Sequence, residues 1–292
     1  MMTRHLVFIV NPNSGVERKK RIRIAIENYL DVDKYSYEIV NTRYARHGID
    51  LARQAAKDKA YAVIAVGGDG SVNDIISGLL GTNTILGIIP KGSGNGMART
   101  LNISLADKEA IDVINNGNIA NMDVAFANEQ LFISNAGVAF DALISKKFAK
   151  STNRGLMIYS WLVTKHLWTY KEWKWKITID GKELETEAFI VNIANGKQFG
   201  YNFKIAPDAD YTDGLLDVIV IHKFPKILGG ALALRALNGT ITNSDYVEHF
   251  RGKEIIVSHP GLKLMQTDGD AHPCGNTVKF RIEHGAQKIF VP

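Results

Sequence analysis

The first 120 residues alternate short β-rich runs with amphipathic stretches, and this alternation constrains the fold more than any other feature. Four runs rich in Val, Ile and Tyr are predicted strands: Leu6–Val10, Tyr35–Val40, Tyr61–Val66 and Thr84–Ile89. Apolar residues at helical spacing lie between them, in Glu17–Leu30, Gly48–Lys59 and Ser71–Leu80. Such alternation builds βαβ units, so we predict an open parallel sheet with helices on both faces.

The pattern changes after Asn121. Met122–Ala127 and Leu131–Ser134 form one predicted hairpin, and Trp173–Ile179 alternates apolar with polar residues as a half-buried strand does. Further predicted strands are Glu183–Asn195, Leu215–Ile221, Glu254–Ser258, Lys263–Thr267 and Val278–Glu283, with helices at Phe140–Lys150, Gly155–Tyr170 and Pro225–Leu237. We therefore predict an α/β domain over residues 1–121 and a mainly antiparallel β domain over residues 122–292, whose end, from about 284, could return to the first domain.

The net charge of +5 and the isoelectric point near 9.1 suit an anionic partner, which could be a nucleotide, a nucleic acid or an acidic lipid. No RNA-binding signature or zinc-finger spacing occurs, so we expect no nucleic-acid partner. Cys274 is the only cysteine, which excludes an internal disulfide and fits a reducing cytosol. No run approaches the roughly 18 apolar residues of a membrane-spanning helix, and Leu6–Val10 is too short for a signal peptide. We expect a cytoplasmic protein.

Three loops follow predicted strands of the first domain, at the ends where parallel sheets bind their ligands. They are Asn11–Gly15, Gly67–Asp74 and Gly92–Gly96. Glycine lets backbone N–H groups approach an anion because it has no Cβ, and a helix that begins next adds unpaired N–H groups and a positive dipole end. Side chains that could also contact phosphate lie in or beside these loops: Ser71, Ser93, Lys91 and Arg99.

The Gly67–Asp74 loop carries the most specific signal. It places Asp69 inside a phosphate-binding turn, where a carboxylate repels phosphate unless a metal ion or a proton transfer requires it. The alternative is that Asp69 caps the following helix, although Ser71 is better placed for that role. Neither a P-loop nor the Rossmann fingerprint in the first βα turn occurs, which argues against P-loop enzymes and dehydrogenases.

Two acidic turns mark the second domain. Asp210, Asp213 and Asp217 offer hard oxygen ligands on a turn that enters a strand, which suits Mg²⁺ or Ca²⁺, whereas the alternative is a solvated Asp-Gly turn. The turn Asp268-Gly269-Asp270 presents two carboxylates close together. Such pairs repel, and they persist mostly beside a metal, a basic partner or a shared proton. Here the alternative is an ordinary exposed turn between strands.

In chain order these motifs resemble the diacylglycerol kinase catalytic-domain family of lipid kinases, which includes bacterial diacylglycerol and phosphatidylglycerol kinases and sphingosine and ceramide kinases. The resemblance rests on Asn11–Gly15, Thr42 with Ala45-Arg46-His47, Gly67–Asn73, Pro90–Asn95, Asp210–Asp217 and Asp268–Asp270. It covers nearly the whole chain. Gly92-Ser93-Gly94-Asn95-Gly96 is closer to sphingosine and ceramide kinases than to the Gly-Thr-Thr/Ala-Asn-Asp of many bacterial members, and Asp270 stands where many have glutamate.

The resemblance implies an ATP-dependent kinase that phosphorylates a hydroxyl of a membrane lipid, diacylglycerol-like or sphingoid-like, in the cleft between a nucleotide-binding and a lipid-substrate domain. Asp270 matches the family's proton-accepting glutamate, so Asp270, Asp268 and Asp69 are the candidate catalytic residues. Asp213, with carbonyls near Asp210 and Leu215, matches a structural Mg²⁺ site. Nucleotide contacts would fall on Asn11, Pro12, Asn13, Ser14, Gly15, Thr42, Gly67, Gly68, Asp69, Gly70, Ser71, Val72, Asn73 and Ser93.

The expected cofactors are ATP and Mg²⁺, and the expected partner is a lipid at the membrane surface, bound peripherally and transiently; a homodimer is compatible with the sequence. A basic cluster precedes an aromatic stretch: Lys146, Lys147, Lys150 and Arg154 come before Trp161, Lys165, Trp168 and Tyr170. This segment could dock on a membrane surface, and the alternative is a core helix with a solvated basic end. NAD kinase and 6-phosphofructokinase share the Gly-Gly-Asp-Gly element but not the other motifs together. A lipid- or nucleotide-binding regulator without catalysis is the non-enzymatic alternative.

Overall fold

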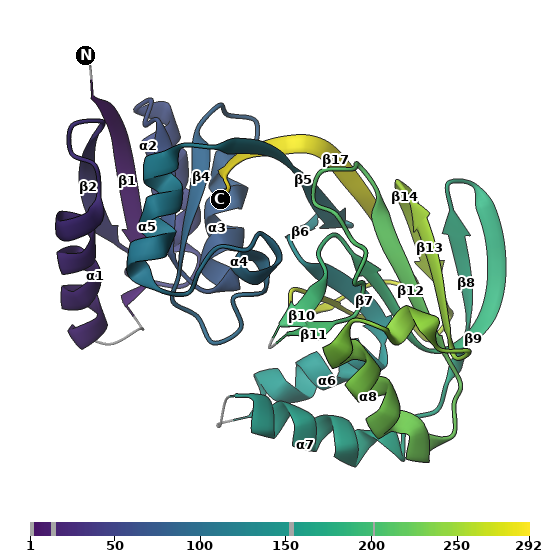
Figure 1. Cartoon of the computed structure of the whole chain (residues 1–292). Helices are drawn as coiled ribbons and strands as arrows, with labels where there is room; N and C mark the ends of the chain where they lie inside the picture. The colour runs from purple at the N-terminus through teal and green to yellow at the C-terminus, as the bar shows by residue number, and fades with distance from the viewer. Residues whose placement is uncertain (1–2, 13–15, 152–154, 201) are drawn as a thin grey trace. The chain divides into compact units, whose positions relative to one another are not determined.

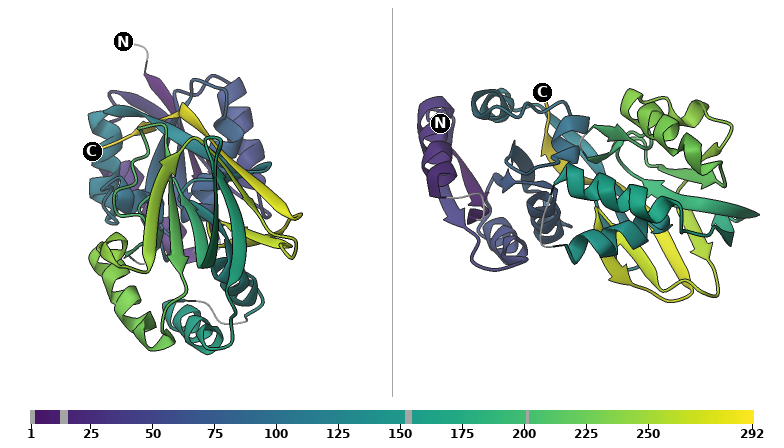
Figure 2. Two further views of the ribbon diagram at one scale, coloured as in Figure 1. Left: turned by 90° about the vertical axis from the view of Figure 1, so that its right-hand side faces the viewer. Right: turned by 90° about the horizontal axis from the view of Figure 1, so that it is seen from below.

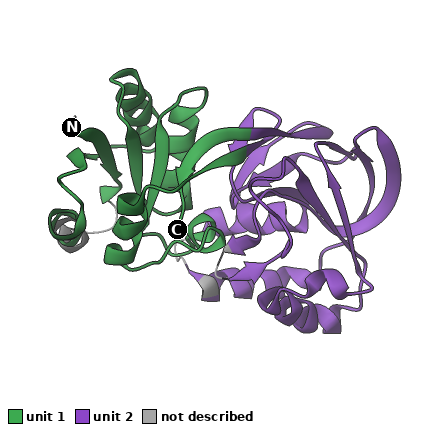
Figure 3. Cartoon of the chain, turned by 45° about the horizontal axis from the view of Figure 1, so that its top comes forward, with its two compact units in different colours: residues 1–123, 285–292 green, residues 124–284 purple. Residues whose placement is uncertain are grey.

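The structure, a computed structural model, describes residues 3–12, 16–151, 155–200 and 202–292 (Figure 1). The chain forms two compact units (Figure 3): residues 1–123 with 285–292, and residues 124–284. The chain passes between the units within two strands, β5 (Ile119–Ala127) and β17 (Thr277–Phe290). Gly285 of β17 has a φ of 62°, which glycine adopts without strain, and its N–H donates to Asp123 at 2.7 Å.

The first unit is built on a parallel sheet with strand order β4-β3-β1-β2. Its strands are β1 (Arg4–Val10), β2 (Tyr35–Asn41), β3 (Ala62–Gly67) and β4 (Ile85–Pro90). Every residue of β3 and β4 is buried, because helices cover both faces of a parallel sheet. The end of β17 adds to this sheet beside β4, where Ile289 pairs with Leu86 in parallel.

The described residues of this unit form the helices α1 (Val16–Tyr29), α2 (His47–Lys57), α3 (Asp69–Leu79), α4 (Gly96–Thr100) and α5 (Asp107–Asn116). Helices α1 and α5 pack together on one face of the sheet, and α2 and α3 on the other (Figures 1 and 2). The strands end level with one another, since Val10 is in register with Asn41 and Val66, and Gly67 with Pro90. The loops that follow β1, β2, β3 and β4 therefore share one edge of the sheet.

The second unit is mainly antiparallel. Besides parts of β5 and β17 it contains β6 (Gln130–Phe132), β7 (Asn135–Ala139), β8 (Trp173–Ile179), β9 (Lys182–Ala194), β10 (Gln198–Gly200), β11 (Phe203–Lys204), β12 (Leu216–His222), β13 (Val247–Gly252), β14 (Glu254–Ser258), β15 (Leu264–Thr267) and β16 (Asp270–Pro273). The order β16-β15-β7-β9-β8-β14-β17 runs through most of them, and β12 joins β9 to β13. Buried side chains such as Phe132, Trp175 and Phe280 form its main core.

Helices α6 (Phe140–Ala149), α7 (Leu156–Leu167) and α8 (Gly229–Asn238) lie beside the strands of this unit (Figures 1 and 2). Short 3₁₀ helices precede and follow α8, at Lys226–Leu228 and Ile241–Asn243. A second apolar core, which includes Phe140, Leu162, Phe189 and Leu232, joins the helices to β9 and β12. No helix in the described part of the chain is both long and apolar enough to cross a membrane.

The predicted fold class, a parallel α/β domain followed by a mainly antiparallel β domain, is confirmed. The sequence places a boundary near Asn121, and the units of the structure divide after Asp123. Helix α3 begins at Asp69 rather than at Ser71, so Ser71 lies inside its first turn and is not its cap. In the described part of the chain, strands β7, β10, β11, β13 and β16, helices α4 and α5, and the 3₁₀ helix at Ile241–Asn243 were not anticipated.

Candidate active site

The two glycine loops after β3 and β4 touch through their backbones. A Cβ built on Gly92 would lie 2.5 Å from the Cα of Gly68, and one built on Gly68 would lie 3.0 Å from the Cα of Gly92. Real Cβ atoms do not approach other atoms to 2.5 Å, so glycine is required at Gly92 for the loops to meet. The N–H of Lys91 also donates to the carbonyl of Gly67 at 2.8 Å. The Gly67–Asp74 and Gly92–Gly96 segments thus meet directly, backbone against backbone.

Asp69 connects these two loops through hydrogen bonds. Its carboxylate oxygens accept the N–H groups of Gly96 at 3.0 Å and Met97 at 3.1 Å, at the start of α4. Asn95 has a left-handed φ of 50°, and its side chain accepts from the N–H and donates to the carbonyl of Gly92, both at 2.8 Å. The sequence-based alternative that Asp69 acts as a helix cap therefore has a counterpart in the structure, but the helix is α4 and not α3.

The predicted nucleotide contacts occupy this edge of the sheet as far as the structure describes them. Asn11 donates to the hydroxyl of Ser71 at 3.5 Å, Thr42 follows β2 directly, and Ser93 is exposed. Pro12 follows β1, whereas Val72 and Asn73 lie inside α3, where the side chain of Val72 is buried. The predicted contacts at Asn13, Ser14 and Gly15 lie outside the described residues. The two basic side chains have partners in the protein, since Lys91 forms an ion pair with Asp107 and Arg99 donates to the carbonyl of Gly94 at 3.1 Å.

A pocket of about 530 Å³ lies at the end of β2 and is lined by Ile39, Val40, Asn41, Arg43, His47 and Leu51. It adjoins Thr42, and it contains the histidine of the Thr42–His47 motif, whose ring stacks on Tyr44 at a centroid distance of 4.3 Å. A pocket of about 410 Å³ in the second unit is lined by Trp175, His259 and their neighbours. It contains none of the predicted site residues, so we assign the pocket beside Thr42 to the candidate site.

In the second unit, Asp268 and Gly269 form the tight turn between β15 and β16, with φ values of 49° and 89°. Two positive φ angles are typical of a type I′ hairpin turn. The carboxylate of Asp268 accepts three backbone N–H groups, from Ile133 at 2.9 Å, Ser134 at 2.8 Å and Asn135 at 3.2 Å. These bonds anchor the turn to the chain before β7, which gives Asp268 a structural role that sequence reasoning missed.

Asp270 follows that turn as the first residue of β16 and is exposed. It pairs across the hairpin with Thr267, whose hydroxyl shares a hydrogen bond of 2.9 Å with His272. Of the two carboxylates in the turn, Asp268 is therefore held by backbone donors, whereas Asp270 faces solvent and is the better candidate to accept a proton from a substrate.

Asp141, at the start of α6, is a buried acid that sequence reasoning also missed. Its carboxylate accepts from the side chains of Gln266 at 3.2 Å and Asn192 at 3.5 Å, and from the N–H of Ala142 at 2.8 Å. Gln266 in turn accepts the N–H of Gly269 at 2.9 Å, so the buried acid connects to the turn before Asp270. Burial raises the pKa of Asp141 to about 7, although its three donors oppose the rise. An aspartate inside the apolar run Val138–Ile144 was the available signal.

We expect Asp141 to make the protein less stable as the pH rises. The folded state holds this proton up to about pH 7 whereas the unfolded chain loses it near 3.8, so folding weakens between those values. The resulting loss in the free energy of unfolding reaches about 4 kcal/mol, of which about 1 kcal/mol arises between pH 6 and pH 8. Tyr159 and Tyr170, which interact with its charge, do not titrate there because burial raises their pKa values.

Chemical denaturation of the wild type and of Asp141→Asn at both pH values checks this expectation. The variant removes the titrating group, so its stability relative to the wild type should increase by about 1 kcal/mol from pH 6 to pH 8. Parallel pH profiles for the two proteins would contradict it.

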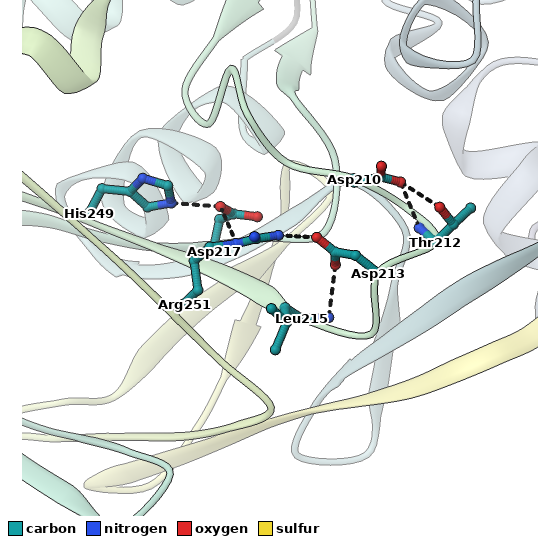
Figure 4. Close-up of polar contacts among 7 residues, drawn as sticks. All are labelled: Asp210, Thr212, Asp213, Leu215, Asp217, His249 and Arg251. Carbon is teal, nitrogen blue, oxygen red and sulfur yellow. Dashed lines mark hydrogen bonds and ion pairs between the residues drawn. The ribbon is translucent and has the colours of Figure 1, made fainter.

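In the turn that is predicted to bind a metal ion, the acidic side chains lie next to the guanidinium group of Arg251 (Figure 4). Asp213 pairs with the guanidinium of Arg251 and accepts the N–H of Leu215 at 3.0 Å, while Asp210 accepts the N–H and hydroxyl of Thr212 at 2.9 and 2.7 Å. Within the described residues, no group of three or more His, Cys, Asp or Glu side chains could hold a metal ion. As arranged, these carboxylates do not fit a bound Mg²⁺, because both oxygens of Asp213 already have a partner, one in Arg251 and the other in the N–H of Leu215.

Comparison with known proteins identifies the class. The family model of the diacylglycerol kinase catalytic domain matches residues 5–127, and that of the YegS C-terminal NAD kinase beta sandwich-like domain matches residues 134–291. The chain therefore belongs to the diacylglycerol kinase catalytic-domain family, in the form that carries a YegS-type C-terminal domain, and this is a family of kinases.

Its relatives are named accordingly. The chain is 30% identical over 233 residues to a probable lipid kinase, YegS-like, of Chromohalobacter salexigens, which covers 78% of this chain and 74% of the relative. It is 27% identical to a diacylglycerol kinase of Bacillus subtilis, over 90% of this chain and 88% of the relative. Its fold matches the crystal structure of a diacylglycerol kinase from Bacillus anthracis with a TM-score of 0.76 and 24% identity, over 100% and 98% of the chains. An NAD kinase from Archaeoglobus fulgidus, solved with ATP, shares the fold at a TM-score of 0.53 and 12% identity, over 99% and 93%.

Proposed function

We propose that this protein transfers the γ-phosphoryl group of ATP to a hydroxyl of a membrane lipid. The observation that carries the proposal is the pair of glycine loops that meet backbone to backbone at the carboxyl edge of the parallel sheet, with Asp69 bonded between them. An edge of this kind presents free N–H groups to an anion. Membership of the kinase family and the names of the relatives support lipid as the acceptor.

Phosphoryl transfer requires mainly that the reactants be positioned and their charge neutralised. The loops after β3 and β4 would hold the phosphates through backbone N–H groups, and the pocket beside Thr42 would take another part of the nucleotide. Mg²⁺ bound with ATP would supply positive charge at the phosphates. Asp69 keeps the two glycine loops in contact and would orient that ion through water.

Asp270 would accept the proton of the lipid hydroxyl. Its side chain is exposed and therefore accessible to a substrate. The turn before it is held in place because Asp268 accepts the N–H of Ile133 and Gln266 accepts the N–H of Gly269. Positioned bases of this kind contribute about 10² to 10⁴ in rate. In this scheme Asp268 is a positioning residue rather than the base.

A panel of acceptors tests the proposal. Purified protein is incubated with labelled ATP and Mg²⁺ and, separately, with diacylglycerol, phosphatidylglycerol, a sphingoid base, ceramide and NAD. We expect label in at least one lipid and none in NAD. Labelled NADP would instead support the kinase that shares the Gly-Gly-Asp-Gly element, and ATP binding without transfer to any acceptor would support a regulator.

We further propose that helices α6 and α7 bring the protein to the lipid surface. Lys146, Lys147 and Lys150 are exposed at the end of α6, whereas Arg154 lies outside the described residues. Trp161 and Trp168 are 56% and 66% exposed, and Lys165 lies 4.7 Å above the ring of Trp161. Exposed tryptophans beside lysines suit the interface of an anionic membrane. Tyr170 does not share this surface, because it packs against Phe140 and Phe189 in the core.

Vesicle binding should therefore depend on salt and on these lysines. About 1 kcal/mol per basic residue gives roughly 3 kcal/mol for Lys146, Lys147 and Lys150. Cosedimentation with anionic vesicles should fall more than about tenfold in Lys146/Lys147/Lys150→Glu, and it should fall with added salt. The matched control Lys57/Lys59/Lys108→Glu changes the net charge equally on exposed sites of the first unit and should bind more tightly than the first variant. Equal loss in both triple variants would refute a localised docking surface.

A further inference from the structure

The acidic turn before β12 is organised around a guanidinium group. Asp217 on β12 is fully buried and lies opposite Arg251 of β13 in the antiparallel register. The Nε of Arg251 lies 3.4 Å from one carboxylate oxygen of Asp217, and the same guanidinium donates to Asp213. His249, two residues earlier on β13, contacts that Asp217 oxygen at 2.6 Å (Figure 4).

Carboxylates gathered in this way need a cation. A buried ionised aspartate is costly unless a charged partner compensates it, and Asp213 adds a second negative charge on the other side of the guanidinium. Arginine is suited to bridge them because it stays charged and presents its donors in a fixed plane. It thus supplies inside the protein what a divalent ion would supply from solution.

We propose that Arg251 is the resident cation of this turn and replaces the metal ion that the acidic motif suggests. The turn from Asp210 to Leu215 is then ordered by the folded chain alone. Any Mg²⁺ that the protein uses enters with the nucleotide, and none is needed to hold β12 and its turn in place. This inference concerns the folded chain and does not depend on the proposed function.

Thermal unfolding of the whole chain without nucleotide, in EDTA and in excess Mg²⁺ or Ca²⁺, tests the proposal. A specific site at a hundredfold excess of ion over Kd would raise the melting temperature by about 5 °C. We expect the wild type and Asp213→Asn to respond equally to the ions. A rise in the wild type that exceeds the rise in Asp213→Asn would show that a metal displaces Arg251, and it would overturn the proposal.

The converse experiment removes the guanidinium. Arg251→Met keeps the apolar stem but leaves Asp213 and Asp217 without it, so the melting temperature in EDTA should fall. Mg²⁺ or Ca²⁺ should restore several degrees, more than in the wild type, whereas Arg53→Met, which removes an exposed Arg–Asp pair, should gain nothing. An ion response in Arg251→Met no larger than in the wild type would overturn the proposal. If Arg251→Met does not fold, the comparison of the wild type with Asp213→Asn still decides.

Discussion

Replacing Asp270 by asparagine is expected to lower kcat by about a hundredfold or more, because the side chain keeps its size but can no longer accept the proton of the substrate hydroxyl. Binding of ATP should stay nearly unchanged, since Asp270 lies in the second unit and the glycine loops lie in the first. Steady-state kinetics on a lipid acceptor, together with calorimetric titration of ATP, separate the two effects.

Two further variants sharpen this prediction. Asp270→Glu should retain substantial activity, because it restores the longer carboxylate of many family members. Asp268→Asn removes an acceptor that holds three backbone N–H groups, so it should lower the melting temperature as well as the activity. If Asp270→Asn leaves kcat within about threefold of the wild type, the base is another residue.

Asp69→Asn is expected to cut turnover by at least about a hundredfold, because metal placement or proton transfer at the phosphate loops is lost. The structure adds a second consequence. The carboxylate accepts two N–H groups at the start of α4, and an amide can accept only one of them well, so we expect a loss of about 1 kcal/mol in the free energy of unfolding. Turnover and chemical denaturation are measured on the same preparation.

Asn95→Gly is the matched control for Asp69→Asn. Glycine tolerates the left-handed backbone of Asn95 but removes its two hydrogen bonds to Gly92, so the loop loosens while Asp69 remains. We expect Asn95→Gly to lose far less activity than Asp69→Asn at a similar loss of stability. Equal losses of activity would mean that Asp69 acts only by holding the loops together.

Strands β1, β3 and β4 of the first unit were predictable because they contain continuous apolar runs. Tyr61–Val66 was predicted and Ala62–Gly67 is the strand, and all six of its residues are buried. In the second unit, β7 reads Asn-Ala-Gly-Val-Ala and β13 reads Val-Glu-His-Phe-Arg-Gly, which lack a clear alternation of apolar residues. These strands form because β9 and β12 offer them partners, which no local pattern reveals.

The candidate site likewise contains some residues whose role the local sequence reveals and others whose role it does not. The glycine loops can be recognised from the local sequence, because the residue type and its position after a strand indicate their role. The role of Asp268 cannot be recognised in this way, because the N–H groups that it binds lie more than 130 residues earlier in the chain. Arg251 is hidden for the same reason, 38 residues after its partner Asp213, and a reading of the acidic turn alone suggests a metal ion.

The most direct test of the account is whether consumption of ATP is coupled to phosphorylation of a lipid. ADP and labelled lipid are measured together in mixed micelles, with γ-labelled ATP and Mg²⁺, for the wild type and Asp270→Asn. We predict equal amounts of ADP and phosphorylated lipid, no turnover without lipid, and near loss of both products in the variant. ADP formed at the same rate without lipid, or no lipid product although ATP binds, would contradict a lipid kinase.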